Sequence, residues 1–313
     1  MLILLKGELN LKAVICTRYG GPEVLQIQDV RKPVPKGGEI LVRVMASAVN
    51  SADVRTRGLE VSGFMRIAMR LMLGWSKPRQ PILGTVFAGT VEGRGAGSFK
   101  TNDRVYGCTS GLSYGCHAEY VTVKSDGAVA HMPENASFDE AVSLVFGGTT
   151  ALSFLDKANP QDGQELLVYG ASGAVGTFAV QIGSALGLKV TGVASGANEE
   201  LVRGLGASDF IDYRNEDYIA KGLSYDIIFD AVGKTSKAIA KKALKPGGKF
   251  ITVGGASVAK ETKAQLEQIK AWFEQGKLKA VIDRTYDLEN AADAHAYVEK
   301  GHKKGNVVLR IQS

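Results

Sequence analysis

The stretch Gly170-Ala171-Ser172-Gly173-Ala174-Val175-Gly176 decides the fold of this 313-residue chain. It follows Leu166-Leu167-Val168-Tyr169, an apolar run typical of a strand buried on both faces. Apolar residues then recur at helical spacing as far as Leu186, and Gly187 follows as a stop. A glycine-rich turn in this context lets backbone amides and a helix N-terminus bind a pyrophosphate. The alternative is a plain glycine-rich turn between a strand and a helix.

The flanking sequence predicts an α/β protein. Downstream strands are expected at 189–195, 210–211, 227–229 and 250–253, and Asn198 is expected to cap the helix that ends at Gly206. Upstream, short β-branched segments at 13–15, 39–45, 85–91 and 118–123 predict a β-rich part. The alternation of strands and helices after about residue 137 indicates an open parallel sheet.

Composition narrows the function classes. The formal net charge is +6, with basic residues scattered among acidic ones rather than clustered, so a nucleic-acid partner is not expected. No apolar run reaches the roughly 18 residues of a membrane span, and the apolar Met1–Leu5 lacks the other marks of a signal peptide. Three scattered cysteines (Cys16, Cys108 and Cys116) predict no disulfide framework. A reducing, cytoplasmic location is therefore expected.

The end of the strand expected at 189–195, the second strand of the parallel sheet, bears on the choice of dinucleotide. NAD-preferring sites place an acidic residue there, whereas this chain reads Val193-Ala194-Ser195-Gly196. Ser195 and Arg214 are candidate partners for a 2′-phosphate, so NADPH is favoured and NADH remains possible. The alternative for Arg214 is a solvated surface residue.

A family resemblance rests on several stretches together. They are residues 18–25 (RYGGPEVL), 48–53 (AVNSAD), 103–107 (DRVYG), the turn at 170–176, 203–213 (RGLGASDFIDY), 230–233 (DAVG) and 282–284 (IDR). In combination they resemble the medium-chain dehydrogenase/reductase superfamily, specifically its zinc-free quinone oxidoreductase-like branch. The resemblance implies a GroES-like β-rich catalytic domain (1–136 with 284–313) and a Rossmann doubly wound parallel-sheet domain (137–283).

The resemblance also implies site residues and an assembly. It places Asn50 and Asp53 in the catalytic cleft, and it implies a homodimer. Together with the turn, the expected cofactor-binding residues are Thr149, Thr150, Gly170, Ser172, Gly173, Ala174, Val175, Gly176, Ser195, Tyr213, Arg214, Val232, Gly233, Gly254 and Asn306.

Zinc is not expected. The zinc-dependent relatives place Cys and His-Glu where this chain has Val49-Asn50-Ser51 and Gly84-Thr85-Val86. Without a Lewis acid, alcohol oxidation is disfavoured, whereas a quinone or an α,β-unsaturated carbonyl is already electrophilic. Asn50 is expected to hydrogen-bond the acceptor carbonyl, and water, Tyr106 or Tyr114 to supply the proton. Packing is the alternative for each tyrosine.

Residues 63–75 are rich in methionine and contain two arginines. Met65, Met69, Met72 and Leu73 are expected to share one helix face. The segment is interpreted as an apolar lid over a lipophilic substrate, with packing and attachment to a membrane surface as alternatives. The sequence therefore predicts a zinc-independent, NADPH-dependent quinone or enone reductase. Two rival functions are a dinucleotide-binding redox sensor without turnover and a membrane-surface reductase of lipid quinones or aldehydes.

Overall fold

The computed structural model describes residues 10–59, 63–93, 95–109, 111, 113–254 and 259–312, without the side chains of residues 63–66 and 68. The chain divides into two compact units. The first unit comprises residues 1–145, 262–267 and 282–313, and the second comprises residues 146–261 and 268–281. Helix α4 (Phe138–Ala158) begins in the first and ends in the second, as does α8 (Lys263–Glu274).

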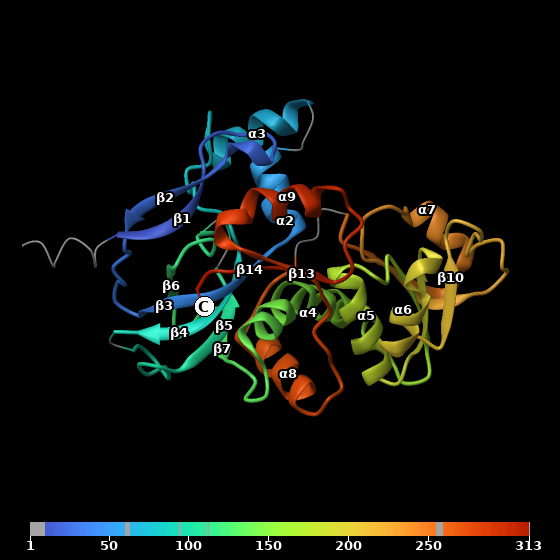
Figure 1. Cartoon of the computed structure of the whole chain (residues 1–313). Coiled ribbons are helices and arrows are strands. Elements are labelled where there is room, and N and C mark those ends of the chain that lie inside the picture. The colour runs from blue at the N-terminus through green and yellow to red at the C-terminus, as the bar shows by residue number, and fades with distance from the viewer. Residues whose placement is uncertain are drawn as a thin grey trace, which may run out of the picture. The chain divides into compact units, whose positions relative to one another are not determined.

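The first unit is built around a mainly antiparallel sheet (Figure 1). Its strands are β3 (Glu39–Val49), β4 (Val86–Glu92), β5 (Arg104–Cys108), β6 (Tyr120–Lys124), β7 (Val129–His131), β13 (Ile282–Asp287) and β14 (Asn306–Arg310). The order is β13-β14-β3-β4-β5-β7, with β6 also paired to β3. The last strand, β14, thus lies inside the sheet, parallel to β13 and antiparallel to β3. A separate hairpin pairs β1 (Asn10–Cys16) with β2 (Leu25–Arg31).

Among the described residues, the α-helices that lie entirely in the first unit are α2 (Ser51–Gly58), α3 (Gly63–Leu73) and α9 (Ala291–Glu299). Helix α9 packs on α2 and on the sheet, as its contacts with β3 and β14 show. The shared core includes Val42, Phe87 and Leu309, which are fully buried. Burial of each such side chain contributes about 1.5–3 kcal/mol, so this core holds the helix that carries the catalytic candidates.

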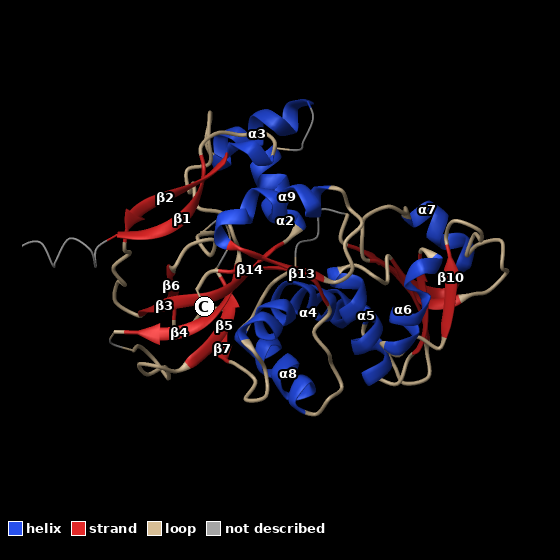
Figure 2. Cartoon of the chain, in the orientation of Figure 1, coloured by secondary structure: helices blue, strands red, loops and turns tan. Residues whose placement is uncertain are grey.

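The second unit contains a five-stranded parallel sheet with helices on it (Figure 2). The strands are β8 (Glu165–Tyr169), β9 (Lys189–Ala194), β10 (Asp209–Asp212), β11 (Tyr225–Asp230) and β12 (Leu244–Thr252), in the order β10-β9-β8-β11-β12. Its helices include α5 (Ala174–Ala185), α6 (Glu199–Gly204) and α7 (Lys237–Ala240). The strand order reverses between β8 and β11. In such sheets ligands bind at the carboxyl ends of the strands beside this reversal.

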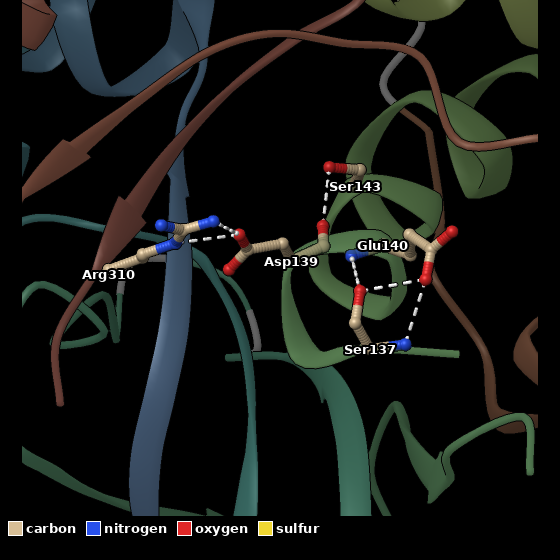
Figure 3. Close-up of polar contacts among 5 residues, drawn as sticks. All are labelled: Ser137, Asp139, Glu140, Ser143 and Arg310. Carbon is tan, nitrogen blue, oxygen red and sulfur yellow. Dashed lines mark hydrogen bonds and ion pairs between the residues drawn. The ribbon is translucent and has the colours of Figure 1, made fainter. Parts of the chain in front are cut away.

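The start of α4 is fixed by side chains (Figure 3). The amide of Ser137 donates to Glu140 Oε2 at 2.9 Å, and the amide of Glu140 donates back to Ser137 Oγ at 3.2 Å. This reciprocal capping satisfies amides that have no partner inside the helix. Arg310 of β14 binds the neighbouring Asp139 with two nitrogens, at 2.8 and 2.7 Å, so the C-terminal strand is tied to the start of α4.

Candidate functional site

The glycine-rich turn after β8 has the conformation that the sequence predicts. Gly170 has φ +83°, a conformation that favours glycine, and its amide donates to Val193 O at 2.9 Å. A Cβ on Gly176 would lie 2.0 Å from Gly170 O, so the helix can approach the strand only with glycine there. A Cβ on Gly173 would meet only Gly170 O, at 3.6 Å. That open side is where a phosphate can approach the backbone.

The N-terminus of α5 has backbone donors without an acceptor inside the helix. Gly173 is the N-cap and supplies no side-chain cap, and the first intrahelical bond runs from Thr177 N to Gly173 O at 2.9 Å. The amides of Ala174, Val175 and Gly176 precede that bond and have no acceptor inside the helix. These donors and the positive end of the helix fit the pyrophosphate of a dinucleotide.

Asp230, at the end of β11, organises the neighbouring loop, although no sequence pattern marked it as a site residue. It is fully buried. Its carboxylate accepts hydrogen bonds of 2.9–3.2 Å from the amides of Val232, Gly233, Lys234 and Thr235 and from the hydroxyl of Thr252. Val232 packs against Gly170, and Gly233 lies against Gly254. The structure therefore brings four predicted cofactor residues to the strand reversal.

Asn198 is the N-cap residue of α6, as predicted, but its side chain makes no cap hydrogen bond. Asn198 Nδ2 donates instead to Ser172 Oγ at 3.2 Å and to Ser195 Oγ at 2.9 Å. It thereby links the glycine-rich turn to the end of β9. Its Oδ1 is buried and has no hydrogen-bond partner among the residues that the structure describes. An acceptor of this kind fits a ribose hydroxyl.

A carboxylate lies beside the end of β9, although β9 itself ends without one. Asp212, from the end of β10, points toward Gly196: a Cβ there would lie 2.7 Å from Asp212 Oδ2. The amide of Arg214 donates to Asp212 Oδ1 at 3.0 Å, and the Arg214 side chain is exposed, as is neighbouring Tyr213. The region expected to receive a 2′-phosphate thus holds one negative and one positive group.

The remaining predicted cofactor residues lie in different units. Thr149 and Thr150 are buried in the part of α4 that belongs to the second unit. There, Gly147 packs so tightly on α5 that a Cβ would lie 2.3 Å from Ala174 O. Asn306 begins β14 in the first unit and is also buried. These positions stay predictions.

In the first unit, Asn50 and Asp53 form the start of α2. Asn50 Oδ1 accepts from the amides of Ala52 and Asp53 at 2.8 and 3.2 Å, and Asp53 Oδ2 accepts from Asn50 N at 3.0 Å. This capping box makes both residues structural supports for the helix. The other polar atom of the Asn50 side chain, Nδ2, takes no part in the capping box and donates to Thr85 Oγ1 at 2.8 Å. Thr85, which the sequence did not single out as catalytic, is half-buried.

Asp53 is a buried carboxyl group with few compensating partners. It is fully buried, and its second oxygen accepts from Gly84 N at 3.1 Å. Desolvation raises the pKa of Asp53 to about 7, although the amides of Asn50 and Gly84 oppose the shift. The folded protein therefore holds a proton on Asp53 at a pH where the unfolded chain does not.

The pH dependence of stability should reveal this proton. Because the pKa in the folded state is raised, the stabilising contribution is fully present below about pH 4 and is lost as the pH rises through about 7. The difference from the ordinary Asp value corresponds to roughly 4 kcal/mol at most. Urea unfolding at several pH values gives the free energy of unfolding of the wild type and of Asp53→Asn. Plotted against pH, the two curves should diverge between these limits and run parallel above them. Parallel curves throughout would contradict the assignment.

The proposed proton-donor role of Tyr106 is not supported by its surroundings. Its side chain is fully buried, and its hydroxyl donates to Leu266 O at 2.6 Å within the first unit. This favours the packing alternative. Tyr114 is also buried, and its hydroxyl lies 2.8 Å from Thr56 Oγ1 in the wall of a cavity of about 670 Å³.

The donors near Asn50 do not fit a zinc ion. Asn50 and Thr85 offer an amide and a hydroxyl, whereas zinc sites use thiolate, imidazole or carboxylate ligands. Burial raises the pKa of the Cys116 thiol, which disfavours the thiolate that binds metal, and His117 is fully buried. Within the described ranges, no three His, Cys, Asp or Glu side chains are grouped to hold a metal.

Comparison with known proteins gives consistent matches. Family models described as "Alcohol dehydrogenase GroES-like domain" and "Zinc-binding dehydrogenase" match residues 36–134 and 205–309. A quinone oxidoreductase of Pongo abelii is 31% identical over 97% of this chain and 99% of its own length. An NADPH-dependent alkenal/one oxidoreductase of Arabidopsis thaliana is 30% identical, over 96% and 79%.

A solved structure agrees with these matches. The quinone oxidoreductase from Coxiella burnetii superposes with a TM-score of 0.82 at 26% identity, covering 97% of this chain and all of that one. Together with the two family models, this confirms the predicted fold class, a GroES-like β-rich domain with a parallel-sheet domain.

Proposed function

Because the chain belongs to the medium-chain dehydrogenase/reductase superfamily, in its quinone oxidoreductase-like branch, we propose that it transfers a hydride from NADPH to a quinone or an α,β-unsaturated carbonyl without zinc. The observation that carries this proposal is the open glycine-rich turn at the N-terminus of α5. The acceptors named for the relatives give the substrate class.

The bound nicotinamide would supply the hydride, and the protein would supply binding and orientation. We assign pyrophosphate binding to the amides of Ala174, Val175 and Gly176, with Gly173 leaving the approach open. The other cofactor-binding residues of the proposal are Thr149, Thr150, Gly170, Ser172, Ser195, Asn198, Tyr213, Arg214, Val232, Gly233, Gly254 and Asn306. Asp230 holds the loop that contains two of them.

We assign to Thr85 the binding of the carbonyl oxygen of the acceptor substrate. Since Thr85 Oγ1 accepts from Asn50 Nδ2, its own proton is directed elsewhere and is available to a substrate oxygen. Negative charge develops on that oxygen as a hydride arrives, and a fixed donor stabilises it. Asn50 then acts by orienting Thr85, while its Oδ1 is committed to the α2 cap. Solvent is the proposed source of the final proton.

Cofactor preference should respond to Asp212, which lies beside Gly196, and to Arg214, whose backbone amide binds Asp212. Arg214→Glu is expected to weaken NADPH binding about tenfold and to leave NADH binding unchanged, because only NADPH carries a 2′-phosphate. Asp212→Asn should shift the preference toward NADPH, because it removes a nearby negative charge. Titration of nicotinamide fluorescence measures both affinities. Lys242 is also exposed in the second unit, so Lys242→Glu serves as a control for the change of charge. Unchanged discrimination in both variants would place the 2′-phosphate elsewhere.

The activity itself is tested by NADPH oxidation with an ortho-quinone, a para-quinone and a short alkenal. NADH replaces NADPH in a parallel series, and enzyme treated with EDTA tests the zinc-independent part of the proposal. Turnover that resists the chelator is expected with NADPH. Cofactor binding without turnover of any acceptor would favour the redox-sensor function instead.

A further inference from the structure

Helix α3 presents large apolar side chains to solvent. Ile67, Leu71, Met72 and Trp75, which we call the α3 face, are 50%, 62%, 49% and 62% exposed. Ile67, Leu71 and Trp75 recur every four residues, so they lie along one side of the helix and its C-terminal turn. The sequence had placed Met65, Met69, Met72 and Leu73 together. Leu73 is instead buried, Met72 points outward, and the Met65 side chain lies outside the described residues.

The end of α3 is firmly attached to the first unit. Tyr19 donates to Gly74 O at 2.9 Å, and Arg79 donates through its side chain to Leu71 O at 3.0 Å. Gly74 has φ +132°, and a Cβ there would lie 2.1 Å from Lys77 O. The turn is thus built to hold Trp75 outward beside Leu71 while Leu73 packs inward. Exposure of the α3 face is therefore a fixed feature of the fold.

The same segment is positively charged. From Val61 to Val91 the sequence contains no acidic residue and four cationic ones, Arg66, Arg70, Lys77 and Arg79. The Arg70 guanidinium lies 5.9 Å from the centre of the Trp75 ring, and both Lys77 and Arg79 are exposed. Apolar side chains, a tryptophan and cations thus lie close together along residues 67–79.

We propose that the α3 face docks this protein on the surface of a lipid bilayer that carries anionic headgroups. Amphipathic helices with Trp and Leu on one side and basic residues beside them bind at the headgroup boundary. Tryptophan favours that boundary, and each cation near an anionic leaflet adds about fivefold to the affinity. The inference is independent of the proposed catalytic function, because it concerns binding alone.

Charge favours the bilayer over a second copy of the chain. A two-fold interface through this face would bring together the cations of two copies, since residues 61–91 contain no acids to pair with them. An anionic surface complements the same charges. Met72 also lines the cavity of about 670 Å³ whose wall includes the Thr56–Tyr114 hydroxyl pair, so a docked face would border this cavity.

Co-sedimentation with vesicles tests the proposal. The protein should bind vesicles of phosphatidylcholine with 30% phosphatidylglycerol at least tenfold more tightly than vesicles of phosphatidylcholine alone, and 0.5 M salt should remove the difference. The double variant Leu71→Gln/Trp75→Gln should lose about hundredfold or more in affinity. Leu223→Gln/Ile239→Gln, which alters exposed apolar residues of the second unit, should bind as the wild type does.

Two further measurements test the same proposal. Lys77→Glu should weaken binding to the anionic vesicles about 25-fold, whereas Lys241→Glu should not. In a Trp272→Phe background, emission from Trp75 should shift to the blue when anionic vesicles are added. Wild-type protein that does not bind these vesicles, or Leu71→Gln/Trp75→Gln protein that binds equally well, would overturn the proposal. So would a wild-type dimer that this variant converts to a monomer without any vesicle binding.

Discussion

Replacing Gly173 with alanine is expected to weaken dinucleotide binding at least a hundredfold while the protein keeps its fold. The Cβ enters open space, 3.6 Å from the nearest backbone oxygen, so folding loses at most about 1 kcal/mol of N-cap preference. The same methyl group occupies the side from which a pyrophosphate approaches the amides of α5. A hundredfold loss corresponds to about 2.7 kcal/mol of binding free energy. Calorimetric titration with NADPH and a thermal melt measure the two effects separately.

Two other glycines serve as controls. Gly204 lies near the end of α6, where a Cβ would meet nothing within 4 Å, so Gly204→Ala should change neither property. Gly176→Ala should lower stability as well as binding, because its Cβ would lie 2.0 Å from a backbone oxygen. Normal NADPH affinity in Gly173→Ala would place the pyrophosphate elsewhere and remove the main support for the proposed function.

Thr85→Val is expected to lower kcat by a factor of 10² to 10³ with little change in NADPH affinity. Valine matches threonine in shape but removes the hydroxyl assigned to the developing negative charge. Because the lost interaction is stronger in the transition state than in the ground state, kcat should fall more than KM rises. Steady-state kinetics with a saturating quinone, together with a binding titration for NADPH, measure both.

Thr85→Ser keeps the hydroxyl and should retain at least a tenth of the wild-type rate. Valine also leaves Asn50 Nδ2 without its present partner, so the thermal melt of each variant shows how much of the loss is structural. A Thr85→Val enzyme with wild-type turnover would remove Thr85 from the mechanism and leave Asn50 as the candidate carbonyl donor.

Local patterns predicted the family, which the comparisons confirm, and the strand–turn–helix unit at 166–186. The family was a resemblance carried by several stretches together, whereas the spacing of neighbouring residues predicted the strand–turn–helix unit. The same reasoning predicted strand positions within a few residues, as in β9 at Lys189–Ala194.

Contacts between distant segments could not be predicted in this way. Asp212 lies beside Gly196 only because β10 pairs with β9, and Thr85 meets Asn50 from 35 positions away. Asn198 is of a residue type that favours helix N-caps, but its side chain binds Ser172 and Ser195 instead. Tyr106 is suited chemically to proton transfer, and only its buried bond to Leu266 O reveals another role. Side-chain chemistry suggested roles for Asn198 and Tyr106, and tertiary packing gave each a different one.

The position of β14 inside the sheet of the first unit has a consequence for biosynthesis. Until residues 306–310 leave the ribosome, the edge of β3 that β14 covers has no partner, although β3 itself was made more than 250 residues earlier. The five parallel strands of the second unit are all complete by residue 252, so that unit can form first. The nascent chain must therefore keep its earliest strands from pairing with other chains for most of its synthesis, and a ribosome that stalls near the end would release a protein with an open sheet edge.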